Sequence, residues 1–205
     1  MDLIATNDAE AVGLLQNERV IHWHDYISNK AVSLQREVLL FVPCAKAKPY
    51  LRPTKSFFYN WLWRFLEREE LRNSVFVCTV SEPFALFPET DYGRMPNYEL
   101  SPLLLKNNSK LLESYTTTLG ESIAGFLRRN FERHKTILAY VRPDSTHALF
   151  LRKANQLLNK SAVRMVASIE DLARIRRIHR RMWHLNWMIY LESQLREIIQ
   201  KELRA

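Results

Sequence analysis

Apolar residues gather along the chain in short runs, separated by longer segments in which they recur every three or four positions. Residues 38–42 and 75–80 are almost wholly aliphatic, β-branched and aromatic, which is typical of strands buried on both faces. We expect strands over residues 37–43, 74–80, 136–141 and 164–168, with helices over 55–71 (capped by Thr54), 109–134 and 145–159. This alternation predicts an α/β fold, a three-layer parallel sheet with helices on both faces.

Three zones follow from the same pattern. Residues 1–35 form an N-terminal helical segment, residues 36–168 the α/β core domain, and residues 169–205 a basic C-terminal helix. We expect this last helix to be long, running from residue 169 to residue 204. Its middle is apolar nearly all the way round, which indicates burial or contact with a partner chain.

The segment 81–108 joins the second strand to a helix and contains four prolines. Loops of this length in compact domains are usually functional, and proline restricts their shape. We therefore expect the segment to present Ser81, Glu82, Tyr98 and Glu99 beside the loop that follows the first strand.

Positive charge is concentrated near the C-terminus. The net charge is +8, yet residues 1–127 hold 13 basic and 15 acidic side chains, whereas residues 128–205 hold 17 basic and 7 acidic ones. The densest cluster gives our candidate nucleic-acid-binding residues: Arg174, Arg176, Arg177, Arg180 and Arg181. Guanidinium groups suit phosphate, so the cluster predicts a nucleic-acid partner. The alternative is an ordinary solvated helix face.

Composition excludes several classes of protein. With 4 glycines, the chain has no glycine-rich dinucleotide or phosphate loop. No apolar run approaches the ~18 residues of a membrane helix, and the acidic start does not resemble a secretory signal, so we expect a cytoplasmic protein. The two cysteines form no CxxC, and the pair His22-x-His24 has no partner at ligand spacing. We therefore expect neither a metal nor a cofactor.

The loop after the first strand carries the most concentrated chemistry. Pro43 ends that strand because proline cannot donate to the ladder, and open α/β sheets bind ligands beyond the carboxyl ends of their strands. Cys44 follows with Lys46 and Lys48 close by, and neighbouring cations favour the reactive thiolate. Cys44 is thus either a nucleophile or a structural thiol, whereas Cys78, inside its strand, is expected to be buried and reduced.

Residues 43–50 match the pattern PCxxxKPY, through Pro43, Cys44, Lys48, Pro49 and Tyr50. This pattern resembles the signature of the archaeosine synthase core domain, a family paralogous to archaeal tRNA-guanine transglycosylases, and further landmarks are similar over residues 37–141. The chain departs from the family pattern at three positions. Pro53 and Ser56 replace a serine and a histidine of the motif, and Glu99 stands where the family usually has an aspartate.

The resemblance implies a uracil-DNA-glycosylase-like fold and an enzyme that adds free lysine to the nitrile of a 7-cyano-7-deazaguanine base in tRNA. A radical S-adenosylmethionine partner then completes the modification. The candidate catalytic residues are Cys44, Lys48, Glu82 and Glu99. The candidate substrate-binding residues are Pro43, Lys46, Pro49, Tyr50, Ser56, Ser81 and Tyr98.

Several alternatives stay open at this point. Tyr50 and Tyr98 either sandwich a planar base or simply pack. Glu82 either accepts N–H donors from a base edge or handles a proton, or it is a cap or the partner of Lys46 or Lys48 in a salt bridge. The chain as a whole is either an enzyme of this kind or a non-catalytic nucleic-acid-binding module or subunit of a base-modification complex. An enzyme acting on modified DNA bases is disfavoured, because Ala45 and Lys46 stand where a water-positioning Asp or Asn is expected.

Overall fold

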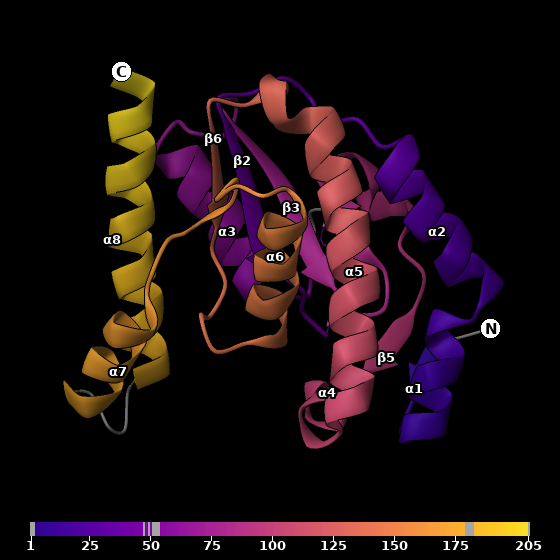
Figure 1. Cartoon of the computed structure of the whole chain (residues 1–205). Coiled ribbons are helices and arrows are strands. Elements are labelled where there is room, and N and C mark those ends of the chain that lie inside the picture. Colours follow the sequence, from indigo (N-terminus) through magenta and orange to yellow (C-terminus); the bar gives the residue numbers. More distant parts are fainter. Residues whose placement is uncertain (1–2, 47, 49, 51–53, 179–182, 205) are drawn as a thin grey trace.

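A five-stranded sheet forms the centre of the protein (Figure 1). The computed structural model describes residues 3–204, apart from 47, 49, 51–53 and 179–182. The strand order is β4-β3-β2-β6-β7, with bounds Val38–Pro43 (β2), Val75–Ser81 (β3), Ala85–Pro88 (β4), Thr136–Ala139 (β6) and Arg164–Met165 (β7). All neighbouring pairs are parallel except β3 and β4. The expected α/β class is confirmed, with an antiparallel edge strand that the sequence pattern did not predict.

The central strand is β2, and it is sealed from water on both faces. Each residue from Val38 to Val42 is 0% exposed, and β3 is buried along its whole length. Phe41 is paired with Cys78 on one side and with Ala139 on the other. The apolar run in the sequence is therefore explained by a position between two parallel neighbours.

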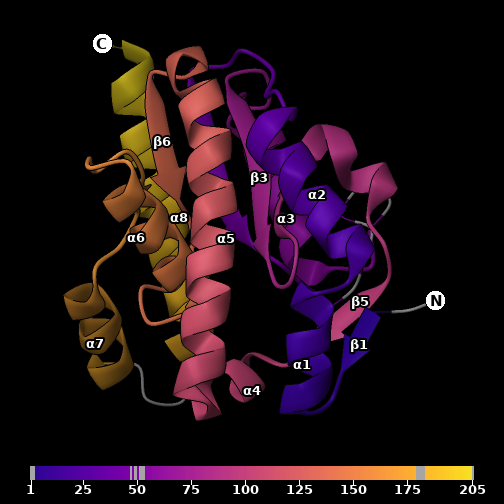
Figure 2. The same cartoon turned by 45° about the vertical axis from the view of Figure 1, so that its right-hand side comes forward.

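Helices cover both faces of the sheet (Figures 1 and 2). Helices α5 (Ser109–Asn130) and α6 (Thr146–Leu157) lie over one face, and α3 (Phe57–Arg68) lies over the other. Ser56, not Thr54, caps α3: its hydroxyl accepts the N–H of Tyr59 at 3.4 Å, while the Thr54 hydroxyl accepts the N–H of Ser56 at 3.1 Å. The predicted cap was two residues too early because both hydroxyls take part in the same turn.

The segment 81–108 is not the long loop that we expected. It contains β4, a 3₁₀ helix (Glu89–Arg94), β5 (Tyr98–Leu100) and α4 (Pro102–Asn107). Strand β5 pairs in parallel with β1 (Leu3–Ala5), so the N-terminal segment contributes a strand as well as α1 (Asp8–Leu15) and α2 (Glu18–Asn29). Strands of three or four residues are too short to show a clear period in the sequence.

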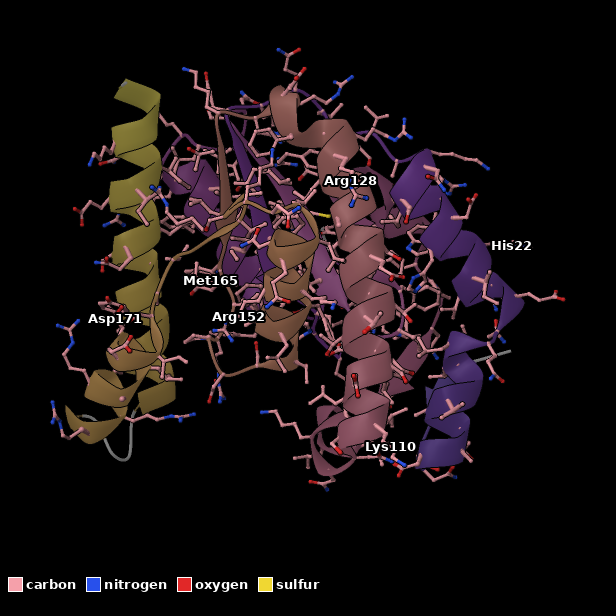
Figure 3. The ribbon with its side chains drawn as sticks, viewed as in Figure 1. His22, Lys110, Arg128, Arg152, Met165 and Asp171 are labelled. Atoms are coloured by element: carbon pink, nitrogen blue, oxygen red, sulfur yellow. The ribbon has the colours of Figure 1, made fainter. Side chains whose placement is uncertain are left out.

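The C-terminal region forms two helices where we expected one. Helix α7 spans Ile169–Ile178 and α8 spans Trp183–Arg204, and the two lie side by side near Asp171 (Figure 3). The Arg174 guanidinium lies 5.6 Å from the centre of the Tyr190 ring, whereas a straight helix would separate these residues by about 24 Å. Glu192 of α8 accepts hydrogen bonds from Trp61 and Arg68 of α3, at 3.1 and 2.6 Å. The chain therefore reverses direction and α8 packs against α3.

Within the described part of the chain, none of the helices combines the length and the apolar character needed to cross a membrane. The helices instead bury apolar faces against the sheet or against one another. Helix α5, for example, buries residues of its inner face against the sheet and against α2 and α6.

The contact between α2 and α5 depends on Gly125. A Cβ at this position would lie 3.0 Å from Cα and 3.1 Å from the carbonyl oxygen of Ser28 in α2. Because the backbone of α2 cannot swing aside, we expect Gly125→Ala to lower the free energy of unfolding by about 1–3 kcal/mol, despite the better helix propensity of alanine. Urea unfolding measures the change.

Gly13→Ala in α1 is the matched control, because nothing lies within 4 Å of its added Cβ. It should raise the free energy of unfolding by up to about 1 kcal/mol. Equal stabilisation by both substitutions would contradict the close approach of α2 and α5.

Candidate functional site

Three chemically active side chains meet at the carboxyl edge of the sheet. Cys44 directly follows β2, Glu82 directly follows β3, and His147 is the second residue of α6, after β6. The distances are 3.5 Å from Cys44 Sγ to His147 Nε2, 3.2 Å from His147 Nε2 to Glu82 Oε2, and 3.9 Å from Cys44 Sγ to Glu82 Oε2. Since β2 lies between β3 and β6, this is the point at which the strand order reverses, where open α/β sheets bind ligands.

Local hydrogen bonds fix the backbone that carries Cys44. The N–H of Cys44 donates to the carbonyl of Val80 at 3.0 Å, which continues the β2–β3 ladder by one residue. The next residue, Ala45, is clamped by the Tyr50 hydroxyl, which accepts the Ala45 N–H at 3.0 Å and donates to the Ala45 carbonyl at 2.8 Å. These bonds hold the backbone at Cys44 and Ala45, and the Cys44 side chain is partly buried.

The acid and the imidazole are almost fully buried, at 4% exposure for Glu82 and 9% for His147. Burial alone would raise the pKa of Glu82, but His147 and a 2.6 Å hydrogen bond from Thr146 outweigh it and lower that pKa to about 2. Burial alone would lower the pKa of His147, but the charge of Glu82 outweighs it and holds that pKa well above its ordinary value. At neutral pH the pair is therefore an imidazolium and a carboxylate, and the imidazolium is placed to stabilise negative charge on sulfur.

These three residues line a pocket of about 360 Å³. The rest of its wall is formed by Ala45, Lys46, Lys48, Asn97, Tyr98, Glu99 and Leu100. Small-molecule sites have volumes of about 300–1,000 Å³. The pocket is therefore large enough for a planar base, with the thiol in its wall.

The expected catalytic residues are brought to one pocket but do not form one cluster. Lys48 Nζ donates to the Tyr98 carbonyl at 3.1 Å and lies 3.8 Å from the centre of the Tyr98 ring, and burial lowers its pKa. Glu99 forms a 2.8 Å ion pair with Lys46, and both side chains are exposed. Glu82 forms its ion pair with His147, and not with Lys46 or Lys48 as the sequence had left open.

Four of the expected substrate-binding residues do not line the pocket: Tyr50, Ser81, Ser56 and Pro43. Tyr50 is 0% exposed and stacks on Tyr59 with ring centres 3.9 Å apart. Ser81 is buried and hydrogen bonded to the Tyr98 hydroxyl. Of the two alternatives left open for these tyrosines, packing describes Tyr50, because its ring is already enclosed in the core.

Neither Ser56 nor Pro43 lines the pocket. Ser56 caps α3, and Pro43 is the last residue of β2, with its carbonyl accepting the Tyr59 hydroxyl at 3.1 Å. Pro49 lies outside the described residues. Cys78 is 0% exposed, and burial raises the pKa of its thiol well above the ordinary value, as expected for a structural cysteine.

His147 is a residue of this candidate site that the sequence analysis did not name. It belongs to no motif and lies 103 positions from Cys44 in the chain. A signal was nevertheless present, because His147 stands at the start of the helix after the strand at 136–139. Polar residues just beyond the carboxyl ends of parallel strands converge in space, and a search of those positions finds it.

The C-terminal arginines that the structure describes are partly paired with acids. Arg174 contacts Asp171 at 3.2 Å, and Arg176 contacts Asp144 at 3.1 Å. Arg177 is exposed, and Arg180 and Arg181 lie outside the described residues. Exposed ion pairs of this kind contribute about 0–1 kcal/mol, so these guanidinium groups can exchange a carboxylate for a phosphate at little cost.

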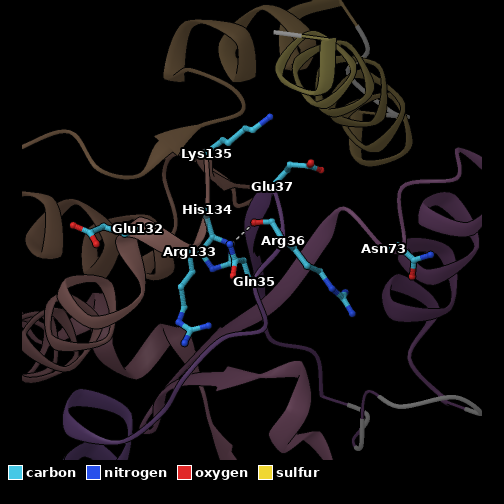
Figure 4. A pocket seen from close by; sticks show the side chains of 8 residues that line it. All are labelled: Gln35, Arg36, Glu37, Asn73, Glu132, Arg133, His134 and Lys135. Atoms are coloured by element: carbon cyan, nitrogen blue, oxygen red, sulfur yellow. Dashed lines mark hydrogen bonds between the residues drawn. The ribbon is translucent and has the colours of Figure 1, made fainter.

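A second pocket, of about 340 Å³, lies at the opposite edge of the sheet (Figure 4). Its wall comes from segments that precede β2, β3 and β6: Gln35, Arg36, Glu37, Asn73, Glu132, Arg133, His134 and Lys135. His134 Nδ1 lies 2.7 Å from the Arg36 carbonyl, and the Arg36 guanidinium donates to Glu89 at 2.8 Å. Arg36 and His134 are thus engaged in structural contacts, and the pocket holds no thiol, so the carboxyl edge remains the candidate site.

Replacing Glu82 with Gln tests the electrostatics of the site. The substitution removes a charge and keeps the shape, so the pKa of His147 should fall below its wild-type value as burial becomes dominant. NMR titration of chelator-treated protein, with His147→Asn for assignment, measures this change. An unaltered His147 titration would contradict the ion pair.

The ion pair of Glu82 and His147 stabilises the folded protein over a limited range of pH. The contribution from His147 is full below its unfolded pKa and is lost as the pH rises through its raised folded pKa. The contribution from Glu82 is full above the unfolded pKa of a glutamate and is lost as the pH falls to about 2. The difference in free energy of unfolding between wild type and Glu82→Gln should therefore be largest between these limits.

Comparison with known proteins gives no relative: no protein-family model, no curated protein and no solved structure matches the chain. What the site can do therefore follows from its own atoms. A thiol, an imidazole and a carboxylate converge on one pocket, and this set suits nucleophilic attack on an electrophilic carbon.

Proposed function

We propose that this chain is a tRNA-modifying protein similar to archaeosine synthase, in which Cys44 attacks the nitrile carbon of a 7-cyano-7-deazaguanine base. One observation carries the proposal. Cys44 belongs to the PCxxxKPY pattern, and its sulfur lies 3.5 Å from the buried imidazole of His147. The mostly parallel sheet with helices on both faces suits the uracil-DNA-glycosylase-like architecture that belongs to the same proposal.

In the first step the Cys44 thiolate, which the neighbouring imidazolium of His147 favours, adds to the nitrile carbon. A C–S bond forms, one π bond of the nitrile breaks, and the nitrogen takes the proton from His147, which gives a thioimidate on Cys44. Glu82 holds the imidazole in position and, through its charge, keeps it protonated until this moment.

In the second step the side-chain amine of free lysine attacks the same carbon. The C–S bond breaks, His147 takes a proton from the amine, and the base carries an amidine joined to lysine. Atoms and electrons balance without an oxidant or reductant. The product is the lysine adduct that, in the family this chain resembles, a radical S-adenosylmethionine partner converts further.

His147 also accounts for a departure from the family motif. The family has a histidine where this chain has Ser56, and here Ser56 caps a helix. We propose that the imidazole is supplied from α6 instead. Glu99 is given no proton-handling role, because its carboxylate is exposed and paired with Lys46.

The second candidate function is a non-catalytic module that holds nucleic acid for a partner enzyme. It is favoured by Pro53 and Ser56 at two motif positions and by the C-terminal arginines. The two candidates differ in whether Cys44 ever becomes bonded to the base.

The covalent intermediate provides the test. Wild-type protein incubated with a nitrile-bearing tRNA stem-loop and no lysine should form a protein–RNA adduct that survives denaturing electrophoresis and maps to Cys44 by mass spectrometry. Cys44→Ser should form none, and His147→Asn should slow its formation roughly 10²–10⁴-fold. Cys78→Ala is the matched control and should behave as wild type.

Adding lysine should release the adduct as lysine-modified RNA. If wild-type protein forms neither adduct nor lysine-modified RNA, the binding-module alternative is correct and the catalytic proposal is wrong.

The docking surface for tRNA is a separate prediction. If Arg174, Arg177 and Arg181 each neutralise a phosphate, replacing all three with Ala should reduce the log–log salt slope of binding by about 2 to 3. Fluorescence anisotropy over a salt series measures it. The charge-matched control replaces exposed basic residues elsewhere with Ala: Arg19, Lys30 and Lys110 (Figure 3 labels Lys110). An equal change of slope in both variants would contradict a specific arginine surface.

A further inference from the structure

Cys44, Glu82 and His147 are arranged around a common centre and not along a line. In a relay, the acid and the thiol contact different nitrogens of the imidazole, but here both contact Nε2. The three atoms Sγ, Oε2 and Nε2 all lie within 4.8 Å of one another. The three atoms, one from each side chain, therefore form a triangle small enough for a single ion to contact all of them.

The edges of this triangle are close in length to those of a metal coordination sphere. A tetrahedral zinc ion with bonds of about 2.0–2.3 Å separates its ligand atoms by about 3.3–3.6 Å. The observed separations are 3.2 Å for nitrogen and oxygen, 3.5 Å for sulfur and nitrogen, and 3.9 Å for sulfur and oxygen. Shifts of a few tenths of an ångström would bring all three atoms to bonding distance.

A neighbouring residue orients the carboxylate for such a role. The Thr146 hydroxyl donates to Glu82 Oε1 at 2.6 Å, which leaves Oε2 directed at the sulfur and the imidazole. Metal-ligating carboxylates are usually held by an outer hydrogen bond of this kind. The same three residues line the pocket, so a fourth ligand can approach from there.

We propose that Cys44, Glu82 and His147 bind Zn²⁺ as a three-ligand site whose fourth position opens into the pocket. A thiolate and a carboxylate together neutralise a doubly charged ion, which suits a site where two ligands are nearly enclosed. Thiolate and imidazole ligands favour zinc over magnesium or calcium, which prefer oxygen. Three protein ligands plus one open position is the arrangement of accessible zinc sites.

Zinc at this site binds the thiol used in the chemistry proposed above. A sulfur bonded to the metal shares a lone pair with it and is a weaker nucleophile than the free thiolate, so zinc binding slows the attack on the nitrile. This regulatory consequence rests on the proposed function, whereas the binding site itself does not.

Cobalt titration tests the site without any assay of activity. Chelator-treated wild-type protein should bind one equivalent of Co²⁺ with a thiolate-to-cobalt charge-transfer band, and one equivalent of Zn²⁺ should remove the band. Cys44→Ser should abolish the band, and Thr146→Val, which keeps all three ligands, should weaken binding about 10–100-fold. His22→Asn, on the exposed side of α2 (Figure 3), is the control and should change nothing.

Alkylation provides an independent readout on the thiol. One equivalent of Zn²⁺ should protect Cys44 of wild-type protein from iodoacetamide, and a chelator should reverse the protection. In His147→Asn the thiol is still present, but protection should be lost.

The absence of a charge-transfer band in wild type, or a band that persists in Cys44→Ser, would overturn the proposal. So would equal protection in His147→Asn. Failure of the proposed function is distinguishable: the band would appear, but metal-free protein would form no adduct with nitrile-bearing RNA.

Discussion

Strand β2 lies between two parallel neighbours, and the whole site depends on this constraint. Because β3 and β6 run in the same direction as β2, the segments that leave their carboxyl ends emerge at one edge. The pairing of Phe41 with Cys78 and with Ala139 fixes the register of the three strands, and so the positions at which those segments begin. A slip of one residue would turn every side chain of a strand to the opposite face, and Glu82 would no longer meet Cys44.

The buried ion pair of Glu82 and His147 has a cost that the fold must offset. Removing one partner of such a pair leaves an uncompensated buried charge, which typically destabilises by about 3–5 kcal/mol. The hydrogen bond from Thr146 and the capped start of α6 hold the pair in place. A fold that maintains two buried charges beside a partly buried thiol keeps that thiol in a defined electrostatic environment, and both proposals make use of it.

The sequence predicted the structure well where local patterns are strong. It predicted poorly the features that depend on contacts between residues distant in the chain. The runs at 38–42 and 75–80 predicted the buried strands, and PCxxxKPY led to Cys44. The pairing of β1 with β5 and the reversal between α7 and α8 depend on contacts between distant residues, which no local period records. His147 was missed for the same reason: its role comes from the order of strands in the sheet, not from its neighbours in the chain.

The central claim is that His147 makes Cys44 a nucleophile, and the rate of alkylation of that thiol measures it most directly. Metal-free protein is treated briefly with iodoacetamide and the modified peptides are quantified, with buried Cys78 as the internal reference. The account predicts that Cys44 reacts faster than Cys78 at neutral pH, and several-fold faster in wild type than in His147→Asn. An equal rate for Cys44 in the two proteins would contradict it.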